Sequence, residues 1–173
     1  NNIYYITPLS KKNYIYADIL PYSDKKIKTD IPIYIVQGSV NRRKISDLIK
    51  ILDVDYKYKF KIKILNKYNL PDSLLPYKDK IIYKQGLDFI NYHKEFSDVY
   101  CILTLLSKTI NNKYYKKQLT STINYARGYK LKCLIDKDLQ DIYKLKNVEI
   151  YNNTNDIQSA FKNTLELFYH KLK

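Results

Sequence analysis

The sequence predicts an α/β fold, a doubly wound parallel sheet with helices on both faces. Short apolar runs alternate with segments of helical periodicity along most of the 173 residues. The connections between them are short, as in strand-helix-strand units. One run, 99–105, is almost continuously apolar, which is typical of a strand covered on both sides. At 20.7 kDa the chain is long enough for one domain with a single core.

The elements follow from these periodicities. We expect strands at 33–36, 60–64, 80–84, 99–105, 131–135 and 148–151. We expect helices after Asn41 and at 88–97, 114–127 and 156–171, with a short helix opening at Asp136. A loop covers 66–79, and another covers 108–113. The order is that of a Rossmann-like domain, whose ligands lie beyond the carboxyl ends of the strands, near the switch point in strand order.

Particular residues are assigned to the ends and faces of these helices. Gly128 is expected to cap the helix at 114–127, and Asp156 is expected to be the N-cap of the last helix. The expected inner face of the helix at 88–97 consists of Phe89, Tyr92, His93 and Phe96. The expected apolar stripe of the last helix runs from Ile157 to Leu172.

Residues 1–32 break the alternation. A strand is possible at 3–6, but 11–30 is polar, rich in tyrosine and interrupted by Pro21. We therefore expect 1–32 to be an extension packed on a Rossmann-like domain formed by 33–173. The chain begins with Asn1-Asn2 and contains no methionine, so we expect it to be a fragment of a longer protein.

Composition limits the classes of partner. The 31 Lys and Arg against 17 Asp and Glu give a net charge of +14, which raises nucleic acid, anionic membranes and phosphorylated ligands as partners. The abundance of Lys, Asn, Ile and Tyr is also typical of an AT-rich genome, so much of this charge is expected on a solvated surface. No apolar run approaches the roughly 20 residues that span a bilayer, so we expect no membrane span and a cytoplasmic location.

Cysteine and histidine usage predicts no metal site. Cys101 and Cys133 lie inside apolar runs, where cysteine behaves as a small hydrophobic residue. His93 and His170 are far apart in sequence, and no paired spacing of metal ligands occurs.

The segment 33–44 is the strongest candidate for binding. An apolar strand runs through Gly38 into a basic helix start that carries Arg42, Arg43 and Lys44. Backbone N–H groups, the positive end of a helix and guanidinium groups together suit a phosphate or diphosphate. A second Gln-Gly pair, Gln85-Gly86, ends another strand, and glycine there lets the backbone turn sharply and approach a ligand.

The order of these motifs resembles the C-terminal, donor-binding domain of GT-B glycosyltransferases. The resemblance runs from residue 31 to the end and rests on Gln37-Gly38, Arg42-Arg43, the segment 87–99 and the helix that leads to Gly128. The amino-acid sequence of 114–115, 118–126 and 128–129 is similar to that of a poorly characterised glycosyltransferase-like group. This group is found in AT-rich genomes, including those of large DNA viruses.

The resemblance implies a ligand and residues that bind it. It implies a nucleotide-sugar donor as substrate, with no metal or further cofactor, and transfer of a hexose-type sugar to a glycan or protein acceptor. It also implies an N-terminal Rossmann-like domain upstream, without which the isolated domain is expected to be inactive. The residues that match the family's donor site are Gly38, Arg42, Arg43 and Lys44 for the diphosphate, Gly86 and Leu87 for the base, and Thr120, Ser121 and Thr122 for the pyrophosphate.

The chain departs from the family in its acidic residues. Retaining members carry two glutamates in this domain, yet no Asp or Glu occurs from 103 through 135. Ser121 and Asn124 are the nearest replacements for the ribose carboxylate. His93 is expected to be packed, and Asp98 is expected to cap backbone, so no catalytic residue is assigned and enzymatic activity stays open.

Two other functions remain. A nucleic-acid-binding module would use the net charge and the interleaved Tyr and Lys of 55–59 and 114–117, because aromatic rings stack on bases and lysines bind phosphates. A catalytically degenerate, glycosyltransferase-like interaction domain would explain the missing carboxylates.

Overall fold

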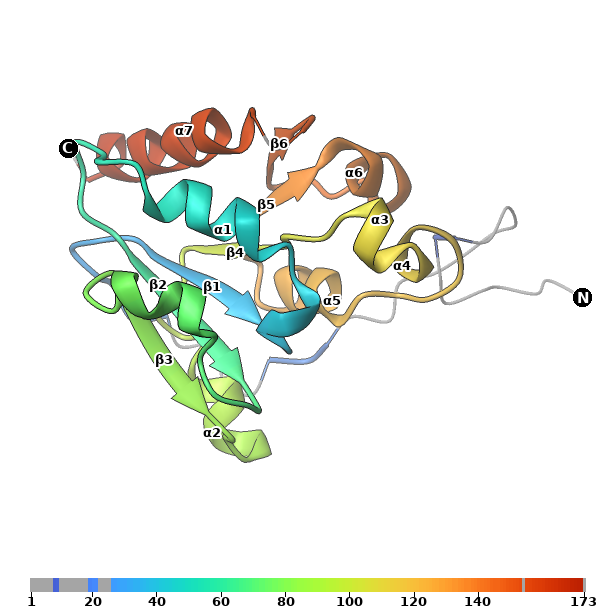
Figure 1. Cartoon of the computed structure of the whole chain (residues 1–173), viewed down its shortest axis with the longest axis horizontal. Coiled ribbons are helices and arrows are strands. Elements are labelled where there is room, and N and C mark those ends of the chain that lie inside the picture. Colours follow the sequence, from blue (N-terminus) through green and yellow to red (C-terminus); the bar gives the residue numbers. More distant parts are fainter. Residues whose placement is uncertain (1–7, 10–18, 22–25, 154, 173) are drawn as a thin grey trace, which may run out of the picture.

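The computed structural model describes residues 8–9, 19–21, 26–153 and 155–172, and it confirms the predicted fold class (Figure 1). Within these residues, six strands form one parallel sheet in the order β3-β2-β1-β4-β5-β6. The strands are β1 Ile33–Gln37, β2 Lys61–Asn66, β3 Ile81–Gln85, β4 Cys101–Leu103, β5 Lys132–Asp136 and β6 Val148–Tyr151. The strand order reverses between β1 and β4, which is the switch point where such sheets bind ligands.

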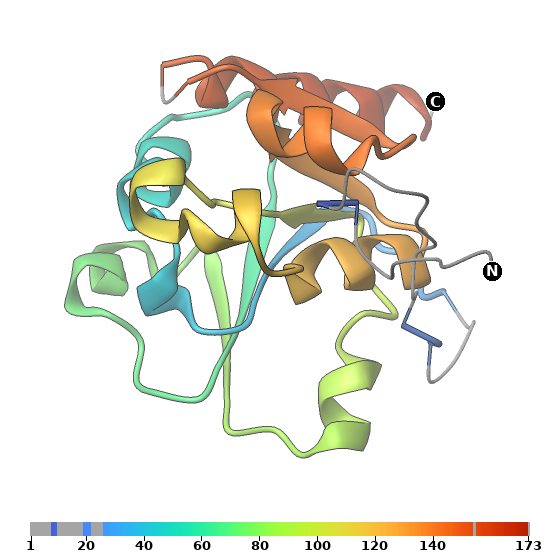
Figure 2. The ribbon, with the colours of Figure 1, turned by 90° about the vertical axis from the view of Figure 1, so that its right-hand side faces the viewer.

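Helices cover both faces of the sheet. They are α1 Ile45–Leu52, α2 Phe89–Lys94, α3 Lys108–Asn111, α4 Lys113–Lys116, α5 Ser121–Gly128, α6 Lys137–Tyr143 and α7 Ile157–His170, with 3-10 turns at Val40–Arg42 and Asp72–Tyr77. Alternate residues of β1 point to opposite faces, so Tyr34 packs in the core under α1 and α7 and Ile35 packs in the core under α2, α5 and α6. Figure 2 shows α1 and α5 on opposite sides of the sheet.

The predicted helix at 114–127 is wrong. The chain forms α4, breaks at 117–120 and starts again as α5, while the predicted loop at 108–113 is largely helical. The break is set by tertiary contacts, because the Thr120 N–H donates to the Tyr143 hydroxyl at 3.3 Å and Thr120 is extended. No glycine or proline marks this break, so helical periodicity alone could not detect it.

Other predictions were too long or assigned a residue to the wrong surface. β4 covers only three residues of the predicted 99–105, and Leu105 already has a φ of 46°. α2 covers only 89–94 of the predicted 88–97. Phe89 and Leu172 were expected to face inward but are 72% and 58% exposed, since Phe89 lies in the first turn of a short helix and Leu172 lies beyond α7.

Gly128 has a different role from the predicted cap. It is the last residue of α5, and the left-handed residue that follows the helix is Lys130, with a φ of 53°. A Cβ on Gly128 would lie 2.0 Å from the carbonyl oxygen of Ile19. The glycine therefore allows a close approach of the N-terminal segment.

The described parts of 1–32 contact the domain at further points. The Ile27 N–H donates to the Ser97 carbonyl at 2.9 Å, and the Lys26 ammonium donates to the Tyr129 carbonyl at 2.9 Å. The possible strand at 3–6 lies outside the described residues. Among the described helices, none combines the length and apolar character that crossing a membrane requires.

Candidate functional site

The candidate site lies at the carboxyl edge of the sheet. Gly38 follows β1 with a φ of 81°, and Gly86 follows β3 with a φ of 61°, both in the left-handed region that favours glycine. A cavity of about 350 Å³ opens between these turns. Its lining includes Gly38, Asn66, Lys67, Lys84, Gly86 and Leu87. We call it the carboxyl-edge cavity, and it brings together three residues that the sequence predicted.

The electrostatics of the carboxyl-edge cavity favour an anion. Lys67 and Lys84 line it, and no described Asp or Glu does. Both lysines are exposed, so their ammonium groups can reach a ligand. Sequence reasoning missed these two lysines, although Lys84 precedes the Gln85-Gly86 pair by one residue.

Arg43 lies behind this cavity and binds the protein itself. Its side chain is buried, with 9% exposed, and burial lowers the pKa of the guanidinium. Nη2 donates to the Gln37 carbonyl at 2.5 Å and to Thr122 Oγ1 at 2.7 Å, and Nη1 donates to the Thr104 carbonyl at 3.2 Å. One residue thus joins the ends of β1 and β4 to the start of α5.

Arg42 and Lys44, the sequence neighbours of Arg43, are less buried than it is. Arg42 is exposed, and its carbonyl accepts a hydrogen bond from Asn111 at 2.9 Å. The Lys44 ammonium lies 3.2 Å from Asp47, and the Lys44 N–H donates to the Leu105 carbonyl at 2.8 Å. Of the three predicted basic residues, Arg42 is therefore the one with an exposed side chain.

Tyr92 from α2 forms a wall of the carboxyl-edge cavity. α2 starts at this edge because Asp88 is its N-cap and accepts a hydrogen bond from the Asn91 N–H at 2.9 Å, which also lowers the pKa of Asp88. The Tyr92 side chain lines the cavity together with Gly38, and burial raises the pKa of its hydroxyl. Sequence reasoning gave Tyr92 only a packing role.

The three predicted hydroxyl residues lie at the N-terminus of α5. Thr120 and Thr122 are buried, whereas Ser121 is exposed and lies 3.4 Å from the Gln37 side chain. Thr122 also donates to the Gln37 side-chain oxygen at 3.0 Å. The break before α5 places these residues at a helix start, and Ser121 is the one that solvent reaches.

Two carboxylates, those of Asp136 and Asp47, lie near this edge; the sequence predicted Asp136 to open a helix but placed neither residue at the site. Asp136 ends β5, caps α6 by accepting from the Leu139 N–H at 3.1 Å, and accepts from the Tyr115 hydroxyl at 3.0 Å. Burial raises the pKa of Asp136. Asp47 is buried in α1 beside Lys44. Asp136 directly follows the stretch 103–135, which contains no Asp or Glu. Both carboxylates already interact with groups of the protein, so neither is free for a ligand.

His93 is packed as predicted. It is buried against the rings of Phe89, Tyr125 and Tyr129, with its Nδ1 2.5 Å from the Tyr129 hydroxyl. Burial lowers its pKa.

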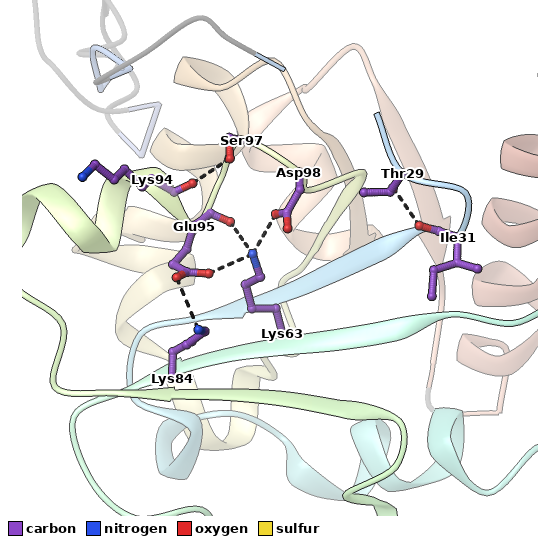
Figure 3. A network of polar contacts seen from close by, with 8 residues as sticks. All are labelled: Thr29, Ile31, Lys63, Lys84, Lys94, Glu95, Ser97 and Asp98. Carbon is purple, nitrogen blue, oxygen red and sulfur yellow. Dashed lines mark hydrogen bonds and ion pairs between the residues drawn. The ribbon is translucent and has the colours of Figure 1, made fainter. Parts of the chain in front are cut away.

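Asp98 belongs to an ion-pair network rather than to a backbone cap among the described residues (Figure 3). Buried Lys63 lies 2.7 Å from Asp98 and 2.9 Å from the Glu95 carboxylate, and it also donates to the Glu95 carbonyl. Glu95 lies 3.9 Å from Lys84. The expected capping role of Asp98 is therefore wrong, because the ammonium of Lys63 on β2 faces it. The network joins the segment after α2 to a lysine of the carboxyl-edge cavity.

The tyrosines of 55–59 are engaged inside the protein. Tyr56 packs against Phe60 and Phe161, with ring centroids 5.7 and 5.3 Å apart, and Tyr58 stacks on Tyr169 at 4.4 Å. Tyr115 is buried. These rings therefore do not form an open platform for bases.

Fold and site together define a Rossmann-like α/β domain with a cation-lined cavity at the carboxyl edge of its sheet. A scan against protein-family models finds no match for the chain, and a search of curated proteins finds no significant relative.

Proposed function

We propose that this chain is the nucleotide-sugar-binding domain of a glycosyltransferase, with the donor's nucleoside diphosphate in the carboxyl-edge cavity. One observation carries the proposal: Gly38, Gly86 and Leu87 line one cavity with Lys67 and Lys84, and no described acidic residue lines it. Parallel α/β sheets bind nucleotides at this edge, near the switch point. The family resemblance supports the same ligand.

The cavity suggests a role for each group. Lys67 and Lys84 of the lining would neutralise the diphosphate, including the charge that develops on it as the sugar leaves. Arg42, which follows the Gly38 turn and is exposed, would add a third cation. The Tyr92 ring and Leu87 offer apolar surface to a base. Arg43 would act indirectly, by holding the Gly38 turn, since its Nη2 lies 3.4 Å from where a Gly38 Cβ would be.

In a complete glycosyltransferase, this domain would be joined to a second domain. A second, N-terminal domain would supply the acceptor site and a catalytic base, and the acceptor would be a glycan or a protein. A cytoplasmic location and an origin in an AT-rich genome, such as that of a large DNA virus, go with the family resemblance.

Titration of the ¹⁵N-labelled chain with UDP, GDP and ADP, followed by NMR, tests the proposal. We expect saturable shifts at 38–39, 66–67 and 84–87 with millimolar or tighter affinity for at least one nucleotide. Lys67→Gln with Lys84→Gln should weaken binding about tenfold, equal to about 1.4 kcal/mol. The matched control is Lys57→Gln with Lys162→Gln, which removes two other lysines and also breaks a weak ion pair with a glutamate. Equal weakening in both variants, or no response to any nucleotide, would contradict the proposal.

One contact favours a second candidate, a catalytically degenerate domain. The Tyr92 side chain lines the cavity beside Gly38, where a phosphate oxygen would otherwise bind. If the wild-type chain binds no nucleotide but the Tyr92→Ala variant does, the cavity is blocked and this second candidate replaces the first.

A further inference from the structure

A second cavity, of about 440 Å³, lies at the opposite edge of the sheet. It opens where α5 and α6 end and immediately before β5 and β6 begin, which is the amino edge of a parallel sheet. Its cations are Arg127, Lys130, Lys144 and Lys146, and its apolar lining includes Leu131 and Leu145. We call it the basic cavity.

The positive charge of the basic cavity is a local feature. Four cations line it and no described acidic residue does. By contrast, the cavity between 54–58 and α7 places Asp55 and Glu166 beside Lys57 and Lys162, so its charges balance. Lys130, Lys144 and Lys146 are exposed and form no ion pair with another described residue.

Helix capping does not account for these cations. The two helix ends carry about −0.5 charge each, against four positive side chains. Several of their terminal carbonyl groups already have backbone donors: the Leu131 N–H donates to Ala126 at 2.9 Å, and the Lys144 N–H donates to Gln140 at 2.8 Å. The Gln140 side chain donates to the Leu145 carbonyl at 3.0 Å. These carbonyl groups therefore do not depend on a lysine ammonium.

Two of these lysines occupy backbone positions that favour glycine. Lys130, two residues after the end of α5, has a φ of 53°, and Lys144, directly after the end of α6, has a φ of 48°. Glycine is the usual residue in this conformation after a helix. A residue with a Cβ is strained in this conformation, and such strain is concentrated at ligand sites. Both positions place an exposed ammonium beside the same cavity.

We propose that the basic cavity binds a phosphate-bearing small molecule, with its phosphate among Lys130, Lys144 and Lys146 and its apolar part against Leu131 and Leu145. The volume falls within the roughly 300–1,000 Å³ of small-molecule sites. Lysine binds phosphate as a mobile point charge, which suits three flexible side chains on two loops. The site is independent of the proposed donor site, because it lies at the other edge of the sheet.

Inorganic pyrophosphate is the probe, and amide shifts of the ¹⁵N-labelled chain are the readout. We expect saturable shifts at 126–131 and 144–147. Lys130→Gln, Lys144→Gln and Lys146→Gln together should weaken these shifts at least about tenfold, and Lys67→Gln with Lys84→Gln should leave them unchanged. The charge-matched control, Lys113→Gln with Lys116→Gln and Lys117→Gln, removes three lysines that line a smaller cavity. Absence of saturable shifts, or equal weakening by the control, would overturn the proposal.

A second variant separates binding from folding. Lys130→Gly with Lys144→Gly relieves the left-handed strain, so we expect a higher thermal unfolding midpoint together with loss of the pyrophosphate response. Retained binding in this more stable variant would refute the assignment. A single-stranded oligouridylate that shifts these amides when pyrophosphate does not would assign the cavity to nucleic acid and would equally refute it.

Discussion

Arg43 and the basic cavity use positive charge in opposite ways. Arg43 is buried and donates its hydrogen bonds to β1, β4 and α5, so its charge holds the fold together at the carboxyl edge. Lys63 does the same between β2 and the segment after α2. The lysines of the basic cavity are exposed and have no carboxylate partner among the described residues. In a chain of net charge +14, the role of a cation follows from the acceptors around it, and the total charge says little about it.

The largest expected effect is that of Arg43→Ala. The variant loses charged hydrogen bonds to three acceptors and leaves two carbonyls and a hydroxyl buried without that donor, so we expect a loss of about 3 kcal/mol or more in unfolding free energy. Urea denaturation measures it. Arg42→Ala is the matched control, since its exposed side chain should contribute within about 0.5 kcal/mol. Similar losses for both variants would show that Arg43 does not hold the fold together.

A smaller loss is expected for Lys63→Met. Glu95 and Asp98 would lose their buried partner, but both are partly exposed, so we expect about 2 kcal/mol rather than the full cost of isolated buried charges. Adding Glu95→Gln and Asp98→Asn should recover part of this loss. Lys137→Met, which breaks an exposed pair with Asp141, should cost about 0.5 kcal/mol. If Lys63→Met and Lys137→Met had equal urea midpoints, Lys63 would contribute no more to stability than an exposed lysine.

The smallest effects concern the backbone turns at the two edges. Gly86→Ala should cost about 1 kcal/mol, because its φ is 61° and no atom lies within 4 Å of the added Cβ, so strain acts alone. Lys144→Gly should stabilise the chain by a similar amount, because its φ is 48°. Paired thermal melts measure both. We expect the unfolding midpoint to fall for Gly86→Ala and to rise for Lys144→Gly. Midpoints that shift in the same direction would contradict the interpretation that Lys144, unlike Gly86, is strained by its positive φ.

Local sequence patterns predicted much of the fold. The strand at 148–151 was predicted with its correct ends, and Gly38 and Gly86 lie at the turns that their positions after apolar strands predicted. These features depend on periodicity and on glycine, which act over a few residues. The break before α5 was missed because the Tyr143 hydroxyl that binds Thr120 is 23 residues away.

For the candidate site, too, local sequence determined some features and long-range contacts determined the others. The sequence by itself determined the alternation of strands and helices, the two glycine turns, and a basic helix start at 42–44. Only the tertiary structure decided that Arg43 faces the interior while Arg42 faces solvent. It also decided that Tyr92 and Gly38 line one cavity, and that residues of 126–131 and 144–147 line the basic cavity. The physical reason is that local patterns set which face of an element is buried, whereas the order of strands in the sheet sets which polar groups meet.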